Sequence, residues 1–461
     1  MRRRRPQRET HEMHQPVAQR DSCLRQRDSG TDAIICAGGR SCAVRHPRSC
    51  LVRRRRRRIP EVGEIVEQDE PRAAPLAGIT VVALEQAIAA PLCTRHLADL
   101  GARVIKVENP GVGDASRHYD GVVHGMAAHF VWLNHGKESA ELDVRDDADR
   151  QVFEGLLERA DVLVSNLAPG ALGRLGLGPD DLVERFPRLI VVDISGYGTG
   201  GPLDHKRAYD LLIQSEGGAC AITGLPGQPV KPGVPVADIG TALYAYSAVL
   251  AALYDRDRTG RGTVVRVAML DVLAEMMGFA ITTVLHGGEM VPVGLGSPTV
   301  APYGAYPTRD GATVVLGTTN DREWRRLTED LLGRPDLAAD PRFAHNSDRV
   351  GVRGELDEIL RDWCSGHDIE DIQRRADEAG IGNARLNDVR DLAAHPQLAE
   401  RGRWREVGSP VGPLPALVPP AMGEGWPRRD GRVPALGEHT AAIRAEVEAL
   451  RPGPDGGARP A

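Results

Sequence analysis

The chain has 461 residues, of which 41% are hydrophobic, and its net charge is −6. This length is sufficient to bury a large core and to form two or three domains. The seven cysteines have no paired spacing, which argues against a disulfide framework, and no CxxC motif or histidine cluster indicates a metal site. The longest apolar stretch, 242–254, is shorter than the roughly 20 residues that cross a bilayer, so we expect a cytoplasmic protein without a membrane segment.

Charge is distributed unevenly along the chain. Residues 1–60 hold 17 arginines and five acidic residues, a net charge of +12, which leaves −18 for residues 61–461. The arginine run 53–58 would suit a nucleic acid, but blocks of like charge without periodicity are typical of tails. We therefore expect residues 1–74 to be a basic tail that is disordered or not part of the functional protein. The acidic body disfavours nucleic-acid binding.

From residue 75 onward, short β-branched runs alternate with helical stretches. We expect strands at 81–84, 104–107, 162–164 and 189–194, with helices such as 92–100 and 150–159 between them. This alternation predicts an α/β fold, a Rossmann-like large domain whose parallel sheet is covered by helices on both faces. The first strand is not followed by Gly-x-Gly-x-x-Gly, so a dinucleotide site is not indicated.

A second, smaller domain is expected after the large one. A segment rich in Gly and Pro, 287–302, follows the large domain, which we place at 75–286. The next region, 303–395, has its own strand at 313–317 and helices near 324–332 and 356–363, as in a small α+β domain. Residues 451–461 are expected to be disordered.

A single carboxylate, Asp238, follows a Pro/Gly-rich loop and opens an apolar helical run over 239–254. Asp at the start of a helix is typical of an N-cap, whose oxygen accepts from the first free N–H groups and contributes about 1 kcal/mol. The same position favours an ionised carboxylate through the helix dipole, and carboxylates can form covalent intermediates. The local sequence leaves both roles open, and they are compatible.

Several separated motifs follow one another in order through the body of the chain. They are LEQAIAAP, GARVIKVE, LNHGK, SNLAPGALGRLG, DISGYG, VPVADIG and, at 434–440, PALGEHT. This series resembles the class III CoA-transferases, the CaiB/BaiF family. The resemblance implies that residues 396–450 return to the large domain and that two chains form an interlocked homodimer.

The resemblance also implies transfer of CoA from an acyl-CoA to a free carboxylic acid. Asp238 matches the family nucleophile, which attacks the thioester and passes through an aspartyl anhydride and an aspartyl-CoA thioester. Covalent catalysis of this kind divides one difficult exchange into easier steps. Gln86 matches a glutamine whose amide would stabilise the oxyanion. No metal or permanently bound cofactor is implied, because CoA enters as a substrate.

Further positions are assigned by the same resemblance. Ala87, Lys137 and Arg174 align with contacts to CoA, and the two cations would suit its phosphates. As isolated residues, such cations are more often exposed surface charges. Gly294 and Gly296 fall where the family has a glycine-rich loop that closes over the intermediate, although this chain has fewer glycines there.

Tyr209 distinguishes two activities within the family. The 2-methylacyl-CoA racemases carry a histidine base at this position, and a tyrosine with a pKa near 10 is a poor base at pH 7. Tyr209 resembles instead a transferase tyrosine that positions a substrate carboxylate, and we interpret its neighbour Asp210 as structural. Other motifs resemble the branch that uses succinyl-CoA with C4 or C5 dicarboxylates. The second carboxylate would need a cation, for which Arg207, Arg309 and His286 are candidates. The alternatives are a racemase and a nucleic-acid-binding protein.

Overall fold

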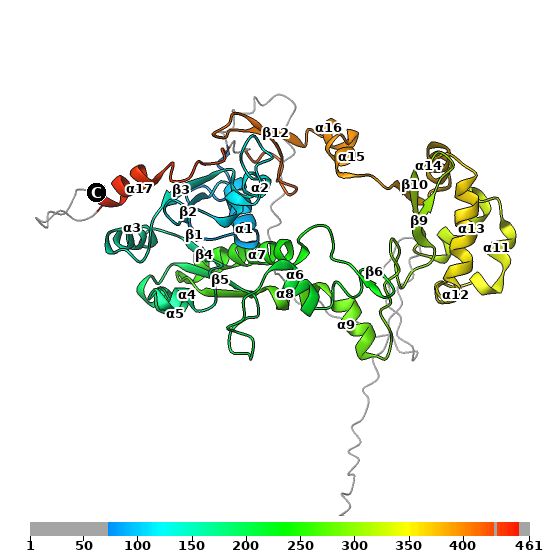
Figure 1. The fold of residues 1–461 in the computed structure, drawn as a ribbon, viewed down its shortest axis with the longest axis horizontal. Helices are drawn as coiled ribbons and strands as arrows, with labels where there is room; N and C mark the ends of the chain where they lie inside the picture. Colours follow the sequence, from blue (N-terminus) through cyan, green and yellow to red (C-terminus); the bar gives the residue numbers. More distant parts are fainter. Residues whose placement is uncertain (1–71, 428–430, 451–461) are drawn as a thin grey trace, which may run out of the picture. The chain divides into compact units, whose positions relative to one another are not determined.

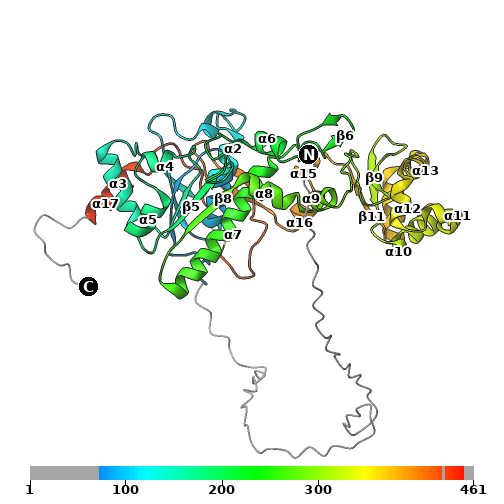
Figure 2. The ribbon, with the colours of Figure 1, turned by 90° about the horizontal axis from the view of Figure 1, so that it is seen from below.

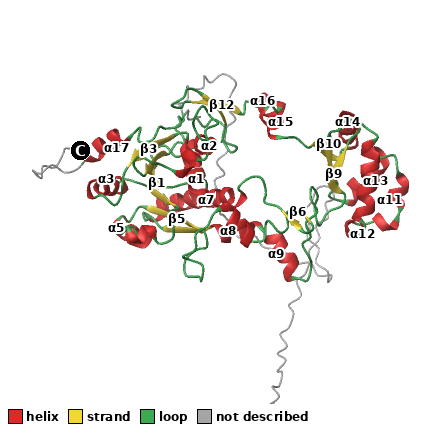
Figure 3. Cartoon of the chain, viewed as in Figure 1, coloured by secondary structure: helices red, strands yellow, loops and turns green. Residues whose placement is uncertain are grey.

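The computed structural model describes residues 72–427 and 431–450, so the expected basic tail and the C-terminal end lie outside the described residues. In the described part, helices and strands form a mixed α/β fold (Figures 1 and 3). Six strands form one parallel sheet, and the other strands form small antiparallel sheets.

The parallel sheet has the strand order β3-β2-β1-β4-β5-β8. The four predicted strands correspond to β1, β2, β4 and β5, whereas β3 and β8 were missed. The sequence of β3, Lys-Glu-Ser-Ala-Glu, carries three charges and gives no strand signal, while the Val-Val-Arg-Val-Ala of β8 does favour a strand. The bounds are β1 (Thr80–Leu84), β2 (Arg103–Glu108), β3 (Lys137–Glu141), β4 (Val162–Ser165), β5 (Ile190–Ser195) and β8 (Val264–Ala268).

One face of the sheet is covered by α1 (Ala89–Asp99), α7 (Val236–Thr259) and α8 (Met269–Met276). Val81 and Val162 point to this face because alternate strand residues face opposite sides. By length and hydropathy, α7 would be long enough to cross a membrane. In the structure one side of α7 packs against α1, β5 and β8 (Figure 2), while Leu243, Tyr244 and Tyr254 on it are exposed.

The other face is covered by α3 (Asp147–Leu157), α5 (Pro179–Arg185) and α17 (Thr440–Ala449). Here the sheet contributes Val82 and Leu163, the neighbours of the residues that face α1. Helix α17 packs on α3 and β3, so the end of the described chain lies beside strands formed early in the sequence (Figure 1).

A second hydrophobic core belongs to the three-stranded antiparallel sheet β11-β10-β9. Its strand β10 (Thr313–Gly317) has the predicted bounds. The bounds of its other strands and main helices are β9 (Tyr303–Pro307), β11 (Gly382–Arg385), α10 (Asp321–Arg326), α13 (Arg353–Ser365) and α14 (Ile369–Ala379).

The remaining elements are short. They are η1 (Ala115–His118), α2 (Ala128–Asn134), α4 (Ala171–Arg174), α6 (Asp210–Glu216), β6 (Gly224–Leu225), β7 (Gln228–Pro229), α9 (Gly278–Leu285), η2 (Leu327–Leu331), α11 (Pro335–Ala339), η3 (Pro341–Phe343), α12 (Asn346–Gly351), α15 (Val389–Ala393), α16 (Pro396–Glu400), β12 (Trp404–Val407) and β13 (Leu414–Leu417).

The strand order reverses between β1 and β4. The chain builds β2 and β3 on one side of β1 and then returns to build β4 on the other side. In open α/β sheets, ligands bind at the carboxyl ends of the strands at such a reversal. The turn after β1 and the loop that begins with Asn166 after β4 meet at this point, through two hydrogen bonds between Gln86 and Asn166.

Candidate active site

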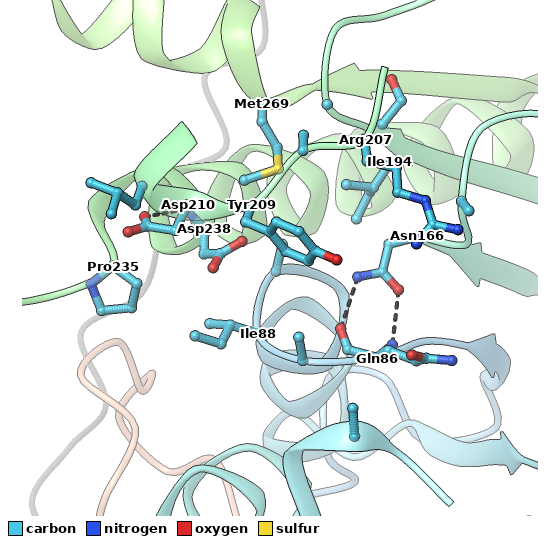
Figure 4. A pocket seen from close by; sticks show the side chains of 18 of the residues that line it. Gln86, Ile88, Asn166, Ile194, Arg207, Tyr209, Asp210, Pro235, Asp238 and Met269 are labelled. Atoms are coloured by element: carbon cyan, nitrogen blue, oxygen red, sulfur yellow. Dashed lines mark hydrogen bonds between the residues drawn. The ribbon is translucent and has the colours of Figure 1, made fainter. Parts of the chain in front are cut away.

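A cavity of about 720 Å³ lies at the carboxyl ends of β1, β4 and β5 (Figure 4). Its walls come from segments that are far apart in the sequence: residues 86–89 after β1, 166–169 after β4, 194–196 at the end of β5, the loop 206–211 and the start of α7. The predicted residues Gln86, Ala87, Tyr209 and Asp238 all line it. The cavity therefore occupies the position at which this class of sheet binds ligands.

Asp238 is the third residue of α7 and is partly buried. The helix begins at Val236, and its N-cap residue, Pro235, has no side-chain capping bond, so the prediction that Asp238 caps the helix is wrong. Asp210 takes that role from another helix. Its Oδ1 accepts from the N–H groups of Ala237, at 3.1 Å, and of Asp238, at 3.4 Å. The carboxylate of Asp238 is left free to face the cavity (Figure 4).

The surroundings of Asp238 disfavour its charged form. Burial raises its pKa to about 7, the negative charge of Asp210 adds to this shift, and Lys231 opposes it. Lys231 itself is held by Asp210, with Nζ 3.2 Å from Oδ2. Among the described residues, none donates a hydrogen bond to the Asp238 carboxylate. At neutral pH this carboxylate is about half ionised and poorly solvated, which suits a nucleophile.

Two aromatic side chains and a histidine line the cavity near Asp238. The exposed Tyr209, at the start of α6, lies beside Asp238 in Figure 4. Burial, followed by the charges of Asp114, Asp238 and Tyr209, raises the pKa of Tyr119. The ring of His129 packs edge-on against Tyr119 with 5.6 Å between centroids. Tyr119 and His129 were not predicted, because neither lies in a recognised motif and only the fold brings them to the cavity.

The turn between β1 and α1 forms another wall of the cavity. The Asn166 amide holds Gln86 through its main chain, accepting from its N–H and donating to its C=O, both at 2.8 Å. Ala87 has a φ of +61°, a left-handed conformation that is uncommon for a residue other than glycine. In Figure 4 the Gln86 side chain extends away from Asp238. Gln86 thus lines the cavity as predicted, but its side-chain amide is not directed at the carboxylate.

Lys137 is not at the cavity. Its side chain is fully buried on β3, and Nζ donates to Glu85 Oε1 at 2.7 Å, to the Pro91 C=O at 2.8 Å and to Asn134 Oδ1 at 2.9 Å. These three bonds use every donor of the ammonium group, so the structure contradicts its assignment as a phosphate contact. A lysine in a segment with this many charged residues was expected to be exposed, but Lys137 lies on β3, where its side chain is buried.

The other predicted contacts lie outside the cavity lining. Arg174 is exposed at the end of α4 and donates to the C=O of Pro169, a residue that does line the cavity. Gly294 donates its N–H to the C=O of Gly224 at 2.7 Å, and Gly296 lies close to it in the chain. Neither glycine is among the residues that line the cavity, so a role of this loop over Asp238 stays a prediction.

One of the three candidate cations reaches the cavity. Arg207 lines its rim and is exposed, and no described residue forms an ion pair or hydrogen bond with it. Arg309 pairs with Asp368 at 2.6 Å, and His286 donates from Nδ1 to the C=O of Thr282. Lys206 and Lys231 also line the cavity, but they pair with Glu216 and Asp210. Arg207 is therefore the lining cation that no described carboxylate already pairs with.

A second cavity of about 340 Å³ lies at the carboxyl ends of β1, β2 and β3. Its lining includes Asn109 and Arg145, and it shares Gln86 and Leu167 with the first cavity. Among the residues that the structure describes, no group of three His, Cys, Asp or Glu side chains is arranged to hold a metal ion. The two cavities together offer space for an extended ligand across the strand reversal.

Comparisons with known proteins agree with this architecture. The acetyl-CoA:oxalate CoA-transferase of Acetobacter aceti is 34% identical over 382 residues, which cover 81% of this chain and 96% of that protein. The succinyl-CoA:mesaconate CoA-transferase of Haloarcula hispanica is 34% identical over 386 residues, 81% of this chain and 96% of that protein.

The fold is also similar to that of a solved CaiB/BaiF family protein from Brucella suis. The TM-score is 0.72 at 35% sequence identity, over 82% of this chain and 100% of that one. The model of CoA-transferase family III matches residues 76–440. The chain thus belongs to CoA-transferase family III and is an enzyme of the EC 2.8.3 type.

Proposed function

We propose that the protein transfers CoA from succinyl-CoA to a C4 or C5 dicarboxylic acid, with Asp238 as the nucleophile. The observation that carries the proposal is the partly buried Asp238 carboxylate at the strand-reversal cavity, to which no residue of the described part of the chain donates a hydrogen bond. The names of the two relatives give oxalate and mesaconate as acceptors, both dicarboxylates, and one of them names succinyl-CoA as the donor.

In the first half of the proposed reaction, an Asp238 oxygen attacks the thioester carbonyl of succinyl-CoA. The C–S bond breaks, CoA thiolate leaves, and a succinyl-aspartyl anhydride forms. The thiolate then attacks the aspartyl carbonyl, which releases succinate and leaves CoA as a thioester on Asp238. Both attacking groups react as anions, the thiolate and the ionised form of Asp238, so neither step needs a separate base.

In the second half, a carboxylate of the acceptor attacks the aspartyl-CoA thioester. A new anhydride forms and the CoA thiolate leaves again. Attack of the thiolate on the acceptor's acyl carbon gives the product thioester and restores the Asp238 carboxylate. Each step develops an oxyanion, which N–H donors must stabilise.

The cavity supplies groups for these tasks. Gln86 and Ala87 bring the turn after β1 into the wall, and the start of α1 follows directly, where free N–H groups favour negative charge. Tyr209 lies beside Asp238 and suits a substrate carboxylate (Figure 4). The free guanidinium of Arg207 suits the second carboxylate of a dicarboxylic acid. We assign CoA itself to the two cavities, which share Gln86 and Leu167 in their linings.

The proposal also includes a cytoplasmic homodimer. Helix α9 exposes large apolar side chains, with Phe279 56% and Leu285 76% exposed, as expected of a surface that a partner covers. The interlocked arrangement follows from the resemblance to the family. Light scattering on the purified protein should give twice the mass of one chain, and a monomer would contradict this part of the proposal.

The decisive experiment combines turnover with covalent capture. The protein is incubated with succinyl-CoA and a panel of acids, new CoA thioesters are separated by chromatography, and hydroxylamine traps the intermediate for peptide mapping. We expect transfer to dicarboxylates and a label on the peptide that contains Asp238. Asp238→Ala should lose at least about 10³-fold in kcat without unfolding. Asp257→Asn, an exposed change at the far end of α7, is the matched control.

Two results would contradict the proposal. Near-normal transfer by Asp238→Ala would exclude this nucleophile. Exchange of the α-proton of a 2-methylacyl-CoA in deuterated water, without acyl transfer, would favour the racemase instead. The nucleic-acid alternative rests on the basic tail, which lies outside the described residues.

A further inference from the structure

A buried network of charges lies directly behind the turn after β1. The side chains of Glu85, Lys106, Asp114 and Lys137 have no exposed surface. Lys106 Nζ lies 2.7 Å from Asp114 Oδ2 and 3.3 Å from Glu85 Oε1, and Lys137 Nζ lies 2.7 Å from the same Glu85 oxygen. Two cations and two anions thus balance one another in the interior.

The Lys106–Asp114 pair remains charged despite its burial. Burial alone would lower the pKa of Lys106, but Glu85 and Asp114 raise it above its ordinary value. Burial alone would also raise the pKa of Asp114, but Lys106 and several N–H donors hold it below its usual range. A buried ion pair is rarely the most stable choice, because packed apolar residues are often as stable or more so. The contacts of this pair with the main chain indicate a geometric role.

That geometric role is visible in the main chain of the turn. Asp114 Oδ1 accepts the N–H of Ala87 at 3.1 Å, and Lys106 donates to the C=O of Glu85 at 3.2 Å. From the other side, Asn166 bonds both main-chain groups of Gln86. Hydrogen bonds therefore fix the main chain at three consecutive residues, Glu85, Gln86 and Ala87. The last of them, Ala87, has the left-handed φ of +61°.

We propose that Lys106 and Asp114 are positioning residues that hold Gln86 and Ala87 in the conformation that presents this wall of the cavity to the acyl group on Asp238. The inference deepens the proposed function and rests on it. Lys106 fixes Asp114 by the 2.7 Å ion pair, and Asp114 fixes Ala87 by the hydrogen bond to its N–H.

The held turn matters because it determines where α1 begins. Among the described residues, the N–H groups of Ile88 and Ala89 have no acceptor, and both residues line the cavity. Donors of this kind act only when they are fixed where negative charge develops. A shift of about 1 Å in such groups is enough to cost on the order of 10²-fold in rate.

The test compares substitutions that keep or remove the bond to Ala87. Asp114→Ala removes the acceptor, while Asp114→Asn keeps an Oδ1 in the same place. We expect kcat for succinyl-CoA and a dicarboxylate to fall about 10- to 100-fold in Asp114→Ala and in Lys106→Met. Asp114→Asn should fall less than Asp114→Ala. Asp114 also lines the second cavity, but the loss should fall mainly on kcat and less on KM for succinyl-CoA, because the positioning acts on the reacting carbonyl.

A remote buried ion pair provides the control for lost stability. Arg405 on β12 pairs with Asp99, the last residue of α1, at 2.8 Å, and both side chains are buried. Arg405→Met should lower Tm to a similar extent, because it also breaks a buried pair, but should leave kcat within about threefold of wild type.

A glycine rescue separates positioning from general damage. The left-handed conformation costs a non-glycine residue the equivalent of about five- to thirtyfold in population, and glycine avoids this cost. The double variant Asp114→Ala/Ala87→Gly should therefore have a kcat about five- to tenfold higher than Asp114→Ala alone. Measuring Ala87→Gly by itself completes the double-mutant cycle.

Several outcomes would overturn the inference. An equal loss of kcat in Arg405→Met would show that stability alone explains the effect, and a cycle without coupling would show that Asp114 does not hold Ala87. Wild-type transfer and labelling of Asp238 are measured in the same assay. A wild-type protein that shows neither transfer nor labelling would overturn the proposed function together with this inference. If wild type is active and labelled, a negative result in the variants overturns only the role of Lys106 and Asp114.

Discussion

The buried charges at two walls of the cavity differ in whether they have partners. Behind the turn after β1, Lys106 and Asp114 pair at 2.7 Å, and both remain ionised. At the start of α7, Asp238 receives no hydrogen bond from any described residue, and burial raises its pKa to about 7. The nearest carboxylate, Asp210, is bonded to the helix N-terminus and to Gln214, so it adds negative charge without donating a proton.

This difference corresponds to two roles: the paired charges fix the conformation of the chain, and the carboxylate without partners is available to react. Charges that are paired and hydrogen-bonded hold one arrangement of the chain, because every alternative leaves a buried charge unpaired. A carboxylate that is buried without partners gains nothing in stability from its ionisation and retains its nucleophilic lone pairs. Neutralising a charge should therefore have opposite effects on stability at the two walls, a loss behind the turn after β1 and a gain at Asp238.

The largest expected effect is a gain in stability when Asp238 is neutralised. Its pKa is about 7 in the folded chain against an ordinary 3.8, so the folded state binds the proton more tightly, and stability falls as pH rises from about 4 to 7. At pH 8, Asp238→Asn should be more stable than wild type by up to about 4 kcal/mol, at 1.36 kcal/mol per pKa unit. Urea unfolding at pH 8 and at pH 5 measures this.

The advantage of Asp238→Asn should shrink as the pH falls from about 7 toward about 4, where wild-type Asp238 becomes protonated. Asp257→Asn, on the exposed end of the same helix, is the control for a general loss of charge. An advantage that does not depend on pH would show that ionisation of Asp238 carries no cost in the folded state.

The pH profile should show a smaller effect. Because the nucleophile must be ionised, kcat/KM should fall about tenfold per pH unit below about 7. Asp210→Asn keeps an oxygen to cap α7 but removes the negative charge beside Asp238, so the acid limb should move to lower pH. The ratio of activity at pH 6 to activity at pH 8 should then rise several-fold. An unchanged limb would exclude Asp210 as the source of the shift.

The smallest expected effect concerns the choice of acceptor. Arg207 lines the cavity without a described partner, so Arg207→Met should raise KM for a dicarboxylic acceptor about 5- to 20-fold. KM for a monocarboxylic acid of the same chain length should change little, because it lacks the second carboxylate. Arg309→Met is the matched control, since Arg309 is an arginine outside the cavity lining and pairs with Asp368 at 2.6 Å. Equal effects on both acids would place Arg207 on CoA instead.

Much of the fold could be predicted because its strands are buried on both faces. Continuous apolar runs rich in β-branched residues, such as 162–164, are typical of strands buried on both faces, and helices of ordinary length separate them. Strand β3 could not be recognised in this way, since Lys137 and Ser139 are buried there only because Glu85 and Glu108 accept from them. These acceptors come from the turn after β1 and from the end of β2, and the sequence of β3 alone does not reveal them.

A residue of the site could be predicted where it lies within a short motif that can be recognised in the sequence. Asp238 and Tyr209 lie in motifs of this kind, and both line the cavity. The cap of α7 was misassigned because Asp210, 28 positions earlier, supplies it. Tyr119 and His129 reach the cavity through tertiary packing alone. Pairings between distant segments were thus the part that local patterns could not predict.

The bonds of α17 have a consequence for synthesis of the chain. Arg103 on β2 pairs with Glu446, 343 positions later, and the N–H of His439 donates to the C=O of Ser139 on β3. The edge of the parallel sheet is completed only when these late residues have left the ribosome. The antiparallel sheet, whose strands end at Arg385, has all of its residues earlier and can form first. The nascent protein must therefore hold the parallel sheet with the edge at β3 incomplete until the residues of α17 have been synthesised.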